Sequence, residues 1–272
     1  MPLSLLILIA TVQGFTEFLP VSSSGHLVLI PIVTNFTYQG RLLDVAAHVG
    51  TLIAVTFYLR VEIIAIITAL LRFGRRDPAN ARLGILLALA TIPVVVAGYF
   101  VNYADWRWLD MVQTLAFANF GFAIILWLSD HVSIKRQGFD SLTWLPALLI
   151  GFAQVCALIP GASRAGVTIS AARLLGYDRI TAARLSLLLS LPTIAGAGLL
   201  KSLDLARSGD AALVSDAAII IVLSAGLAWL AISWMMRWLA KANLSIFVYY
   251  RMALGAFLLL GLSQGWLDPL IS

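Results

Sequence analysis

The stretch QGFTEFLPVSSSGH, residues 13–26, decides how this chain is organised, because it places a proline and several polar residues inside an apolar region. Apolar sequence leads up to it from Leu3 and resumes after it as LVLIPIV. Neither half can cross a bilayer core of about 30 Å, which takes roughly 20 helical residues. Non-helical backbone at membrane depth must be satisfied by protein or a wet cavity. We therefore predict a re-entrant helix–loop–helix over about residues 1–35, with its loop lining a cavity.

A second broken region, 144–175, carries the stretch PGASRAG at residues 160–166. Its Pro-x-x-Ser pattern repeats the pattern at 20–23, and a glycine follows in both cases, as Gly25 and Gly166. A pair of interrupted apolar segments in corresponding positions indicates an internal repeat whose site lies at the repeat interface. We expect this region to form the second re-entrant hairpin.

Composition assigns the rest of the chain to the membrane. Of 272 residues, 61% are hydrophobic and 11% are charged, whereas soluble domains are about 25% charged. We predict an all-α polytopic membrane protein with about six transmembrane helices and two re-entrant hairpins, built as interdigitated inverted-topology repeats. The expected spans lie near 42–59, 83–103, 111–129, 181–201, 216–236 and 247–265. They belong to a single membrane domain, 1–272, with repeat halves of about 1–130 and 131–272.

The basic residues indicate orientation. They are scattered over short loops without a continuous stripe, so the net charge of +5 does not indicate a nucleic-acid partner. One side of the predicted topology holds only Arg41, Arg107, Lys201 and Arg207. With Arg164 and Arg251 set aside as intramembrane, 12 of the 18 Lys and Arg residues fall on the other side, which is therefore cytoplasmic. With this orientation, the first hairpin enters the membrane from outside and the second enters from the cytoplasm. Separately, Glu62 to Arg76 is predicted to be an amphipathic helix at the cytoplasmic interface.

Two charged side chains at membrane depth point to a working site. Each costs roughly 2.5–3.5 kcal/mol on insertion scales, so Glu17 and Arg164 are retained for function unless they only neutralise each other. Serines at 22–24 and Ser163 precede the next helical segments, where serine caps free N–H groups. Two half-helix N-termini that converge would also suit an anion, and the Arg164 guanidinium matches phosphate oxygens. We expect a phosphate or diphosphate to contact Gln13, Ser22, Ser24, Gly25, Ser163 and Gly166.

Glu17 alone would repel such an anion. A hard divalent cation, Mg²⁺ or Ca²⁺, removes the conflict if it bridges the carboxylate and the substrate. Gln13, four residues earlier on the same helical face, offers a neutral carbonyl ligand to that metal. Alternatively, Glu17 orients and polarises His26. The residues leave both roles open.

His26 follows Ser23 by three residues, so that imidazole and hydroxyl can meet as base and nucleophile. Alternatively, His26 attacks phosphorus itself. Asp44 and His48, one helical turn apart, are interpreted as a structural pair. Arg251 is interpreted as snorkelling, as pairing with an acid, or as contacting the substrate.

The two stretches together resemble the paired motifs of the bacterial undecaprenyl-diphosphate phosphatases, also called bacitracin-resistance proteins. The resemblance implies hydrolysis of undecaprenyl diphosphate to the monophosphate carrier used in peptidoglycan synthesis. It also implies a divalent metal, location in the bacterial inner membrane, a site open to the periplasm, and often a homodimer. By motif position, the catalytic roles fall to Glu17, Ser23, His26 and Arg164.

This chain departs from the family pattern at two positions. Gln13 stands where many relatives have Glu, which leaves one fewer negative ligand for a metal, and Ala165 stands where many have Ser. A secondary transporter or lipid flippase with a midplane anion site is the alternative function, and a receptor or assembly factor is a third. Ser23 and His26 favour the phosphatase, because a transporter needs no nucleophile.

Overall fold

The computed structural model is helical, as predicted, and every element named in it is an α-helix or a short 3₁₀ turn. It describes residues 1–272 except 28, 31–40, 105, 134–136, 208–210 and 271–272. Side chains are also left undescribed at 41–42, 102, 197–207 and 211–212. Part of the first predicted hairpin, 31–35, and two basic residues used for orientation, Lys135 and Arg136, therefore lie outside the described residues.

Eleven α-helices are described, and each predicted span overlaps one of them, with one end of three spans lying one or two residues outside the helix. They are α1 (Leu3–Thr16), α2 (Ser23–Leu27), α4 (Arg41–Tyr58), α5 (Arg60–Leu71), α6 (Pro78–Tyr103), α7 (Val112–Val132), α8 (Trp144–Val155), α9 (Arg164–Leu174), α10 (Arg179–Arg207), α11 (Ala211–Leu239) and α12 (Ser245–Ser263). By length and apolar composition, the described parts of four helices, α6, α7, α11 and α12, can cross a membrane. Counting the bent pair α4–α5 as one span gives a fifth. The protein is therefore a multi-pass helical membrane protein.

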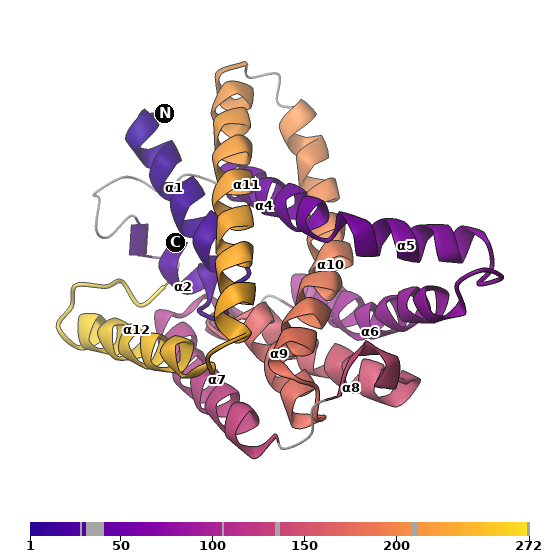
Figure 1. The fold of residues 1–272 in the computed structure, drawn as a ribbon. Coiled ribbons are helices and arrows are strands. Elements are labelled where there is room, and N and C mark those ends of the chain that lie inside the picture. The colour runs from indigo at the N-terminus through magenta and orange to yellow at the C-terminus, as the bar shows by residue number, and fades with distance from the viewer. Residues whose placement is uncertain (28, 31–40, 105, 134–136, 208–210, 271–272) are drawn as a thin grey trace.

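Each broken segment packs against a long helix from the other half of the chain. Helix α1 lies beside α11 (Figure 1), and α8 packs on α6. Both contacts are close because they use glycine: a Cβ on Gly14 would lie 2.8 Å from Leu227 Cβ, and one on Gly151 would lie 2.3 Å from the Ala90 carbonyl oxygen. Small residues allow such approach between membrane helices, where packing replaces the hydrophobic effect as the main attraction. The two halves are thus held together as one unit.

Helix α5 is apolar on all sides, whereas Glu62 to Arg76 was predicted to be amphipathic. Its apolar side chains occur on all sides: Val61, Ile64 and Leu71 are exposed, whereas Ile66 is buried. The helix follows α4 after a bend of 79° and extends with α6 to one side of the molecule (Figure 1). It is tied to α10 by an ion pair between Glu62 and Arg184. An all-round apolar helix suits contact with lipid or protein better than an interface position.

A buried ionic cluster anchors the far end of α9. Asp130 on α7 accepts hydrogen bonds from Arg173 Nε at 3.2 Å, Arg179 Nε at 2.7 Å and the Leu244 backbone N–H at 3.1 Å. Arg173, one of the basic residues counted on the cytoplasmic side, is buried near the end of α9. Breaking such a buried pair on one side typically costs about 3–5 kcal/mol. The cluster therefore joins α7, α9, α10 and the start of α12, and it fixes the orientation of α9.

Candidate active site

The two loops between half-helices share an unusual backbone. The residue before α2, Ser22, has φ of +71°, and the residue before α9, Ser163, has φ of +67°. Positive φ is uncommon outside glycine. A glycine follows three residues later in both loops, at Gly25 and Gly166. Ser22 therefore corresponds to Ser163, one residue earlier than the sequence parallel suggested, and the next residues, Ser23 and Arg164, occupy equivalent positions.

The charged residues of the two motifs meet directly. Glu17 Oε1 accepts a hydrogen bond from Arg164 Nη2 at 3.1 Å, and the two side chains are only 8% and 14% exposed. The other carboxylate oxygen, Oε2, accepts bonds from Ser23 Oγ at 3.0 Å and from Gln13 Nε2 at 2.8 Å. Residues 147 positions apart thus form one cluster around the Glu17 carboxylate.

Arg164 is held on three sides. Besides Glu17, it binds the Ser186 carbonyl oxygen through Nη1 at 3.3 Å, and its guanidinium carbon lies 5.7 Å from the centre of the Phe18 ring. The Ser163 hydroxyl caps α9 by accepting a bond from the Gly166 N–H at 3.2 Å. These contacts orient the guanidinium at the first residue of a half-helix, where the positive end of the helix dipole adds to its charge.

Two serines of the first loop bind each other, and one of them also binds the second loop. Ser22 Oγ and Ser24 Oγ lie 3.1 Å apart, and Ser24 Oγ accepts a bond from the Gly161 N–H at 3.3 Å. Their hydroxyls therefore join the two loops to each other. Gly25 lies against Asn119 of α7, where a Cβ would come within 3.3 Å of the amide nitrogen.

Among the described hydrogen bonds, none joins His26 to Ser23, the predicted base–nucleophile pair. Its Nδ1 lies 2.7 Å from the Ser22 carbonyl oxygen and its Nε2 lies 2.5 Å from the Tyr250 hydroxyl. Because the Ser23 hydroxyl binds Glu17 instead, the hydrogen-bonded base of Ser23 in this arrangement is the Glu17 carboxylate. Among the described contacts, Glu17 makes no hydrogen bond to His26 either, so the contacts do not support its alternative role as the group that orients the imidazole.

Sequence reasoning missed two members of the site, His48 and Tyr250. His48 Nε2 lies 3.7 Å from Glu17 Oε2, and its Nδ1 binds the backbone carbonyl oxygen of Asp44 at 2.8 Å. Tyr250 reaches His26 from α12, 224 residues away. Sequence could have pointed to both residues, because each carries a titratable or hydroxyl-bearing side chain in an apolar span. It does not show, however, toward which neighbouring segment the helix directs that side chain.

Arg251 stabilises the loop before α9 through hydrogen bonds to its backbone. It is fully buried, and its Nη2 donates to the carbonyl oxygens of Gly161 at 2.8 Å and Ala162 at 2.9 Å. A Cβ on Gly166 would lie 2.6 Å from its Nη1. In the described part of the chain it neither snorkels to an interface nor pairs with an acid. Its Nε and Nη1 have no hydrogen-bond partner there.

A hard divalent cation such as Mg²⁺ or Ca²⁺ requires about six or more oxygen ligands. No group of three or more His, Cys, Asp or Glu side chains suited to a metal occurs among the residues that the structure describes. The site offers the Glu17 carboxylate and the Oε1 atom of Gln13, which is buried and has no hydrogen-bond partner there. Such oxygen donors fit Mg²⁺ or Ca²⁺ when substrate oxygens and water supply most ligands.

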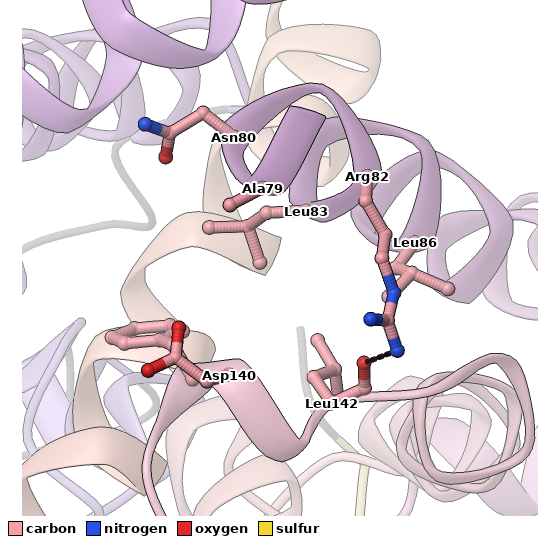
Figure 2. Close-up of a pocket in the computed structure, with 8 residues that line it drawn as sticks. Ala79, Asn80, Arg82, Leu83, Leu86, Asp140 and Leu142 are labelled. Carbon is pink, nitrogen blue, oxygen red and sulfur yellow. Dashed lines mark hydrogen bonds between the residues drawn. The ribbon is translucent and has the colours of Figure 1, made fainter. Parts of the chain in front are cut away.

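A separate cavity lies away from this cluster. It has a volume of about 260 Å³ and opens between the start of α6 and the connection that precedes α8 (Figure 2). Arg82 closes one side by donating to the Leu142 carbonyl oxygen at 2.8 Å, and Asp140 lies on the opposite side. The other lining residues are Ala79, Asn80, Leu83, Leu86 and Phe139. None of the predicted site residues lines it.

Fold and site together define a multi-pass membrane protein with a polar, charged cluster between two broken helices. The family described as bacitracin resistance protein BacA matches residues 6–257, and the chain belongs to this family. It is 42% identical over 258 residues to an undecaprenyl-diphosphatase of Dinoroseobacter shibae, covering 94% of this chain and 97% of the relative. Undecaprenyl-diphosphatases of Ruegeria pomeroyi and Alcanivorax borkumensis are each 42% identical over 259 residues, covering 93% and 94% of this chain and 96% and 98% of the relatives.

Proposed function

We propose that this protein hydrolyses undecaprenyl diphosphate to undecaprenyl phosphate and inorganic phosphate. This activity recycles the lipid carrier for peptidoglycan synthesis and confers resistance to bacitracin. The activity of the named relatives and the family description support the proposal. The observation in this chain that carries it is the Glu17–Arg164 ion pair with the Ser23 hydroxyl bound to the same carboxylate. The names of the relatives do not favour the transporter alternative.

Arg164 binds the diphosphate in this proposal. Its guanidinium presents several donors in one plane, which match phosphate oxygens better than a point charge does. The first turn of α9 directs the positive end of its dipole toward the same place. When a phosphate oxygen engages the guanidinium, the guanidinium's attraction for Glu17 is shared with the substrate. The carboxylate is then better able to accept a proton.

Ser23 is the nucleophile that this geometry supports best. Its Oγ donates to Glu17 Oε2 at 3.0 Å, so Glu17 takes the proton as Oγ bonds to the terminal phosphorus. The bond from that phosphorus to the bridging oxygen breaks, and undecaprenyl phosphate leaves with the electron pair. Water then cleaves the phosphoserine, releasing inorganic phosphate. In this second step His26 Nε2, on the same half-helix as Ser23, accepts a proton from the attacking water, and Ser23 Oγ leaves with the electron pair and regains the proton held by Glu17.

The remaining sequence-predicted residues have supporting roles. Ser22, Ser24 and Ser163 shape the loops, because their hydroxyls already bind each other or cap α9. Gly25 and Gly166 admit neighbouring side chains closely. Glu17 and Gln13 would hold Mg²⁺ or Ca²⁺, and this cation would neutralise charge on the diphosphate.

The arrangement in the membrane is part of the proposal. We propose six spans and two re-entrant hairpins in inverted, interdigitated halves, about 1–130 and 131–272, in a bacterial inner membrane with the site open to the periplasm. A homodimer is also proposed. The pairings of α1 with α11 and of α8 with α6 support interdigitated halves.

In a Cys156→Ala background, an impermeant thiol reagent should label Arg107→Cys but not Arg75→Cys in intact spheroplasts. Labelling of position 75 from outside would reverse the orientation.

The activity is tested by phosphate release from long-chain prenyl diphosphate by the purified protein in detergent, with and without EDTA. We expect release that EDTA abolishes and that added Mg²⁺ or Ca²⁺ restores. A folded protein that releases no phosphate with either metal present would refute the hydrolase. Release unaffected by EDTA would refute only the metal.

A further inference from the structure

The three histidines of this chain share one hydrogen-bonding pattern. In each, Nδ1 lies 2.7 or 2.8 Å from the backbone carbonyl oxygen four residues earlier. A carbonyl oxygen only accepts, so Nδ1 carries the proton and the lone pair of the neutral ring lies on Nε2. The three histidines are His26, His48 and His131. Any proton transfer or attack by His26 must therefore use Nε2.

In the structure, His26 Nε2 already has a hydrogen-bond partner, the Tyr250 hydroxyl. The Tyr250 hydroxyl lies 2.5 Å from His26 Nε2, and the two rings are nearly parallel, with 2° between their planes. With Nδ1 protonated, the phenol is the donor and Nε2 the acceptor. Tyr250 thus covers the lone pair that the chemistry requires.

The helix backbone that carries Tyr250 is anchored by the next residue, and Tyr250 itself is 47% exposed. The next residue on α12, Arg251, is buried and binds two carbonyl oxygens of the loop before α9. Adjacent residues of one helix therefore contact both broken segments: Tyr250 reaches the first, and Arg251 reaches the second. The phenol is presented to His26 from a helix that is fixed to the loop before Arg164.

We propose that Tyr250 is a positioning residue for His26. It donates to Nε2, holds the imidazole in one orientation and covers the reactive nitrogen until the substrate displaces the phenol. The catalytic meaning of this contact rests on the proposed hydrolysis, but the contact itself does not. The chemistry assigned to Tyr250 is hydrogen-bond donation alone, with no bond made or broken at its oxygen.

The contact is tested without substrate, by carbethoxylation of Nε2 with diethyl pyrocarbonate, followed by peptide mass spectrometry. Tyr250→Phe keeps the ring and removes the donor. Because one hydrogen bond contributes about 0.5–1.5 kcal/mol net, we expect modification of His26 to be about 2- to 10-fold faster in this variant. His131, with the same Nδ1 bond and an exposed side chain, is the internal reference. Tyr249→Phe, at a neighbouring side chain that is 66% exposed, is the matched control and should leave the rate unchanged.

Equal rates of His26 modification in the wild type and in Tyr250→Phe would overturn the proposal, whether or not the protein is a hydrolase. Kinetics separate the role further. A positioning residue predicts that kcat falls about 2- to 10-fold at unchanged KM in Tyr250→Phe. A loss beyond about 10²-fold would make Tyr250 a proton donor instead, because general acid catalysis contributes about 10²- to 10⁴-fold. Unchanged kcat would also contradict positioning.

Discussion

Replacing Arg164 with Lys keeps a positive charge beside Glu17 but removes the forked guanidinium. The two terminal nitrogens have different partners: Nη2 binds Glu17 at 3.1 Å and Nη1 binds the Ser186 carbonyl at 3.3 Å. One ammonium group at the end of a flexible stem does not reproduce both contacts in a fixed plane. The variant therefore loses orientation more than charge.

The two energetic consequences differ in size. Removing one oriented donor to a reacting group costs about 2.7–4 kcal/mol, or about 10²- to 10³-fold in kcat. Leaving the buried Glu17 carboxylate unpaired would add about 3–5 kcal/mol of instability, but Lys retains a cation there. We therefore expect turnover to fall about 10²-fold or more while the protein remains folded.

The assay is phosphate release from a long-chain prenyl diphosphate, with thermal unfolding measured in the same detergent. Arg237→Lys is the control, because this guanidinium lies on α11 outside the site and donates only to the Ser233 carbonyl among the described contacts. It should keep turnover. Near-normal turnover in Arg164→Lys would refute the reasoning and reduce Arg164 to a diffuse charge or a structural partner of Glu17.

Two further predictions concern the loop before α9 and the attacking group. Gly161→Ala places a Cβ 2.2 Å from the Leu115 carbonyl oxygen at φ of +92°, and the left-handed backbone alone costs about 1–2 kcal/mol. The unfolding midpoint of this variant should therefore drop by at least about 2 °C. Gly121→Ala, with open space at its Cβ, should not lower the midpoint, and equal midpoints for the two variants would contradict the packing. Ser23→Ala and Glu17→Gln should each remove most turnover, with the double variant scarcely worse than either, because hydrogen-bonded residues that act as a unit are non-additive. Wild-type protein quenched during turnover should carry acid-stable phosphoserine. An acid-labile adduct would assign the attack to His26 instead, and full activity in both Ser23→Ala and His26→Ala would leave a metal-activated water as the attacking group.

Much of the architecture follows from local features of the sequence. Apolar stretches long enough to span a bilayer predicted six spans, and each of these overlaps a helix of the structure. Proline and polar residues at 13–26 and 160–166 predicted two breaks, because non-helical backbone in a membrane needs polar partners. The cost of burying charge singled out Glu17 and Arg164, and the structure brings these two side chains together.

Local features were not enough for α5 and for the exact repeat alignment. Residues 62–76 were predicted to form an amphipathic interfacial helix, yet α5 is apolar on every side. The shared serines suggested one register, whereas the positive φ angles of Ser22 and Ser163 define another. Backbone dihedrals in a turn depend on what surrounds it, since strained values persist only where packing enforces them.

Partner choice within the site was decided by tertiary structure alone. Ser23 and His26 are close in sequence, but Ser23 binds Glu17 and His26 binds Tyr250. Successive residues of an α-helix point about 100° apart. Whether Tyr249, Tyr250 or Arg251 faces the first loop therefore depends on how α12 packs against α7, a contact between distant segments. The sequence by itself determined which residues are costly to place in a membrane, and the packing of the helices determined which of them meet.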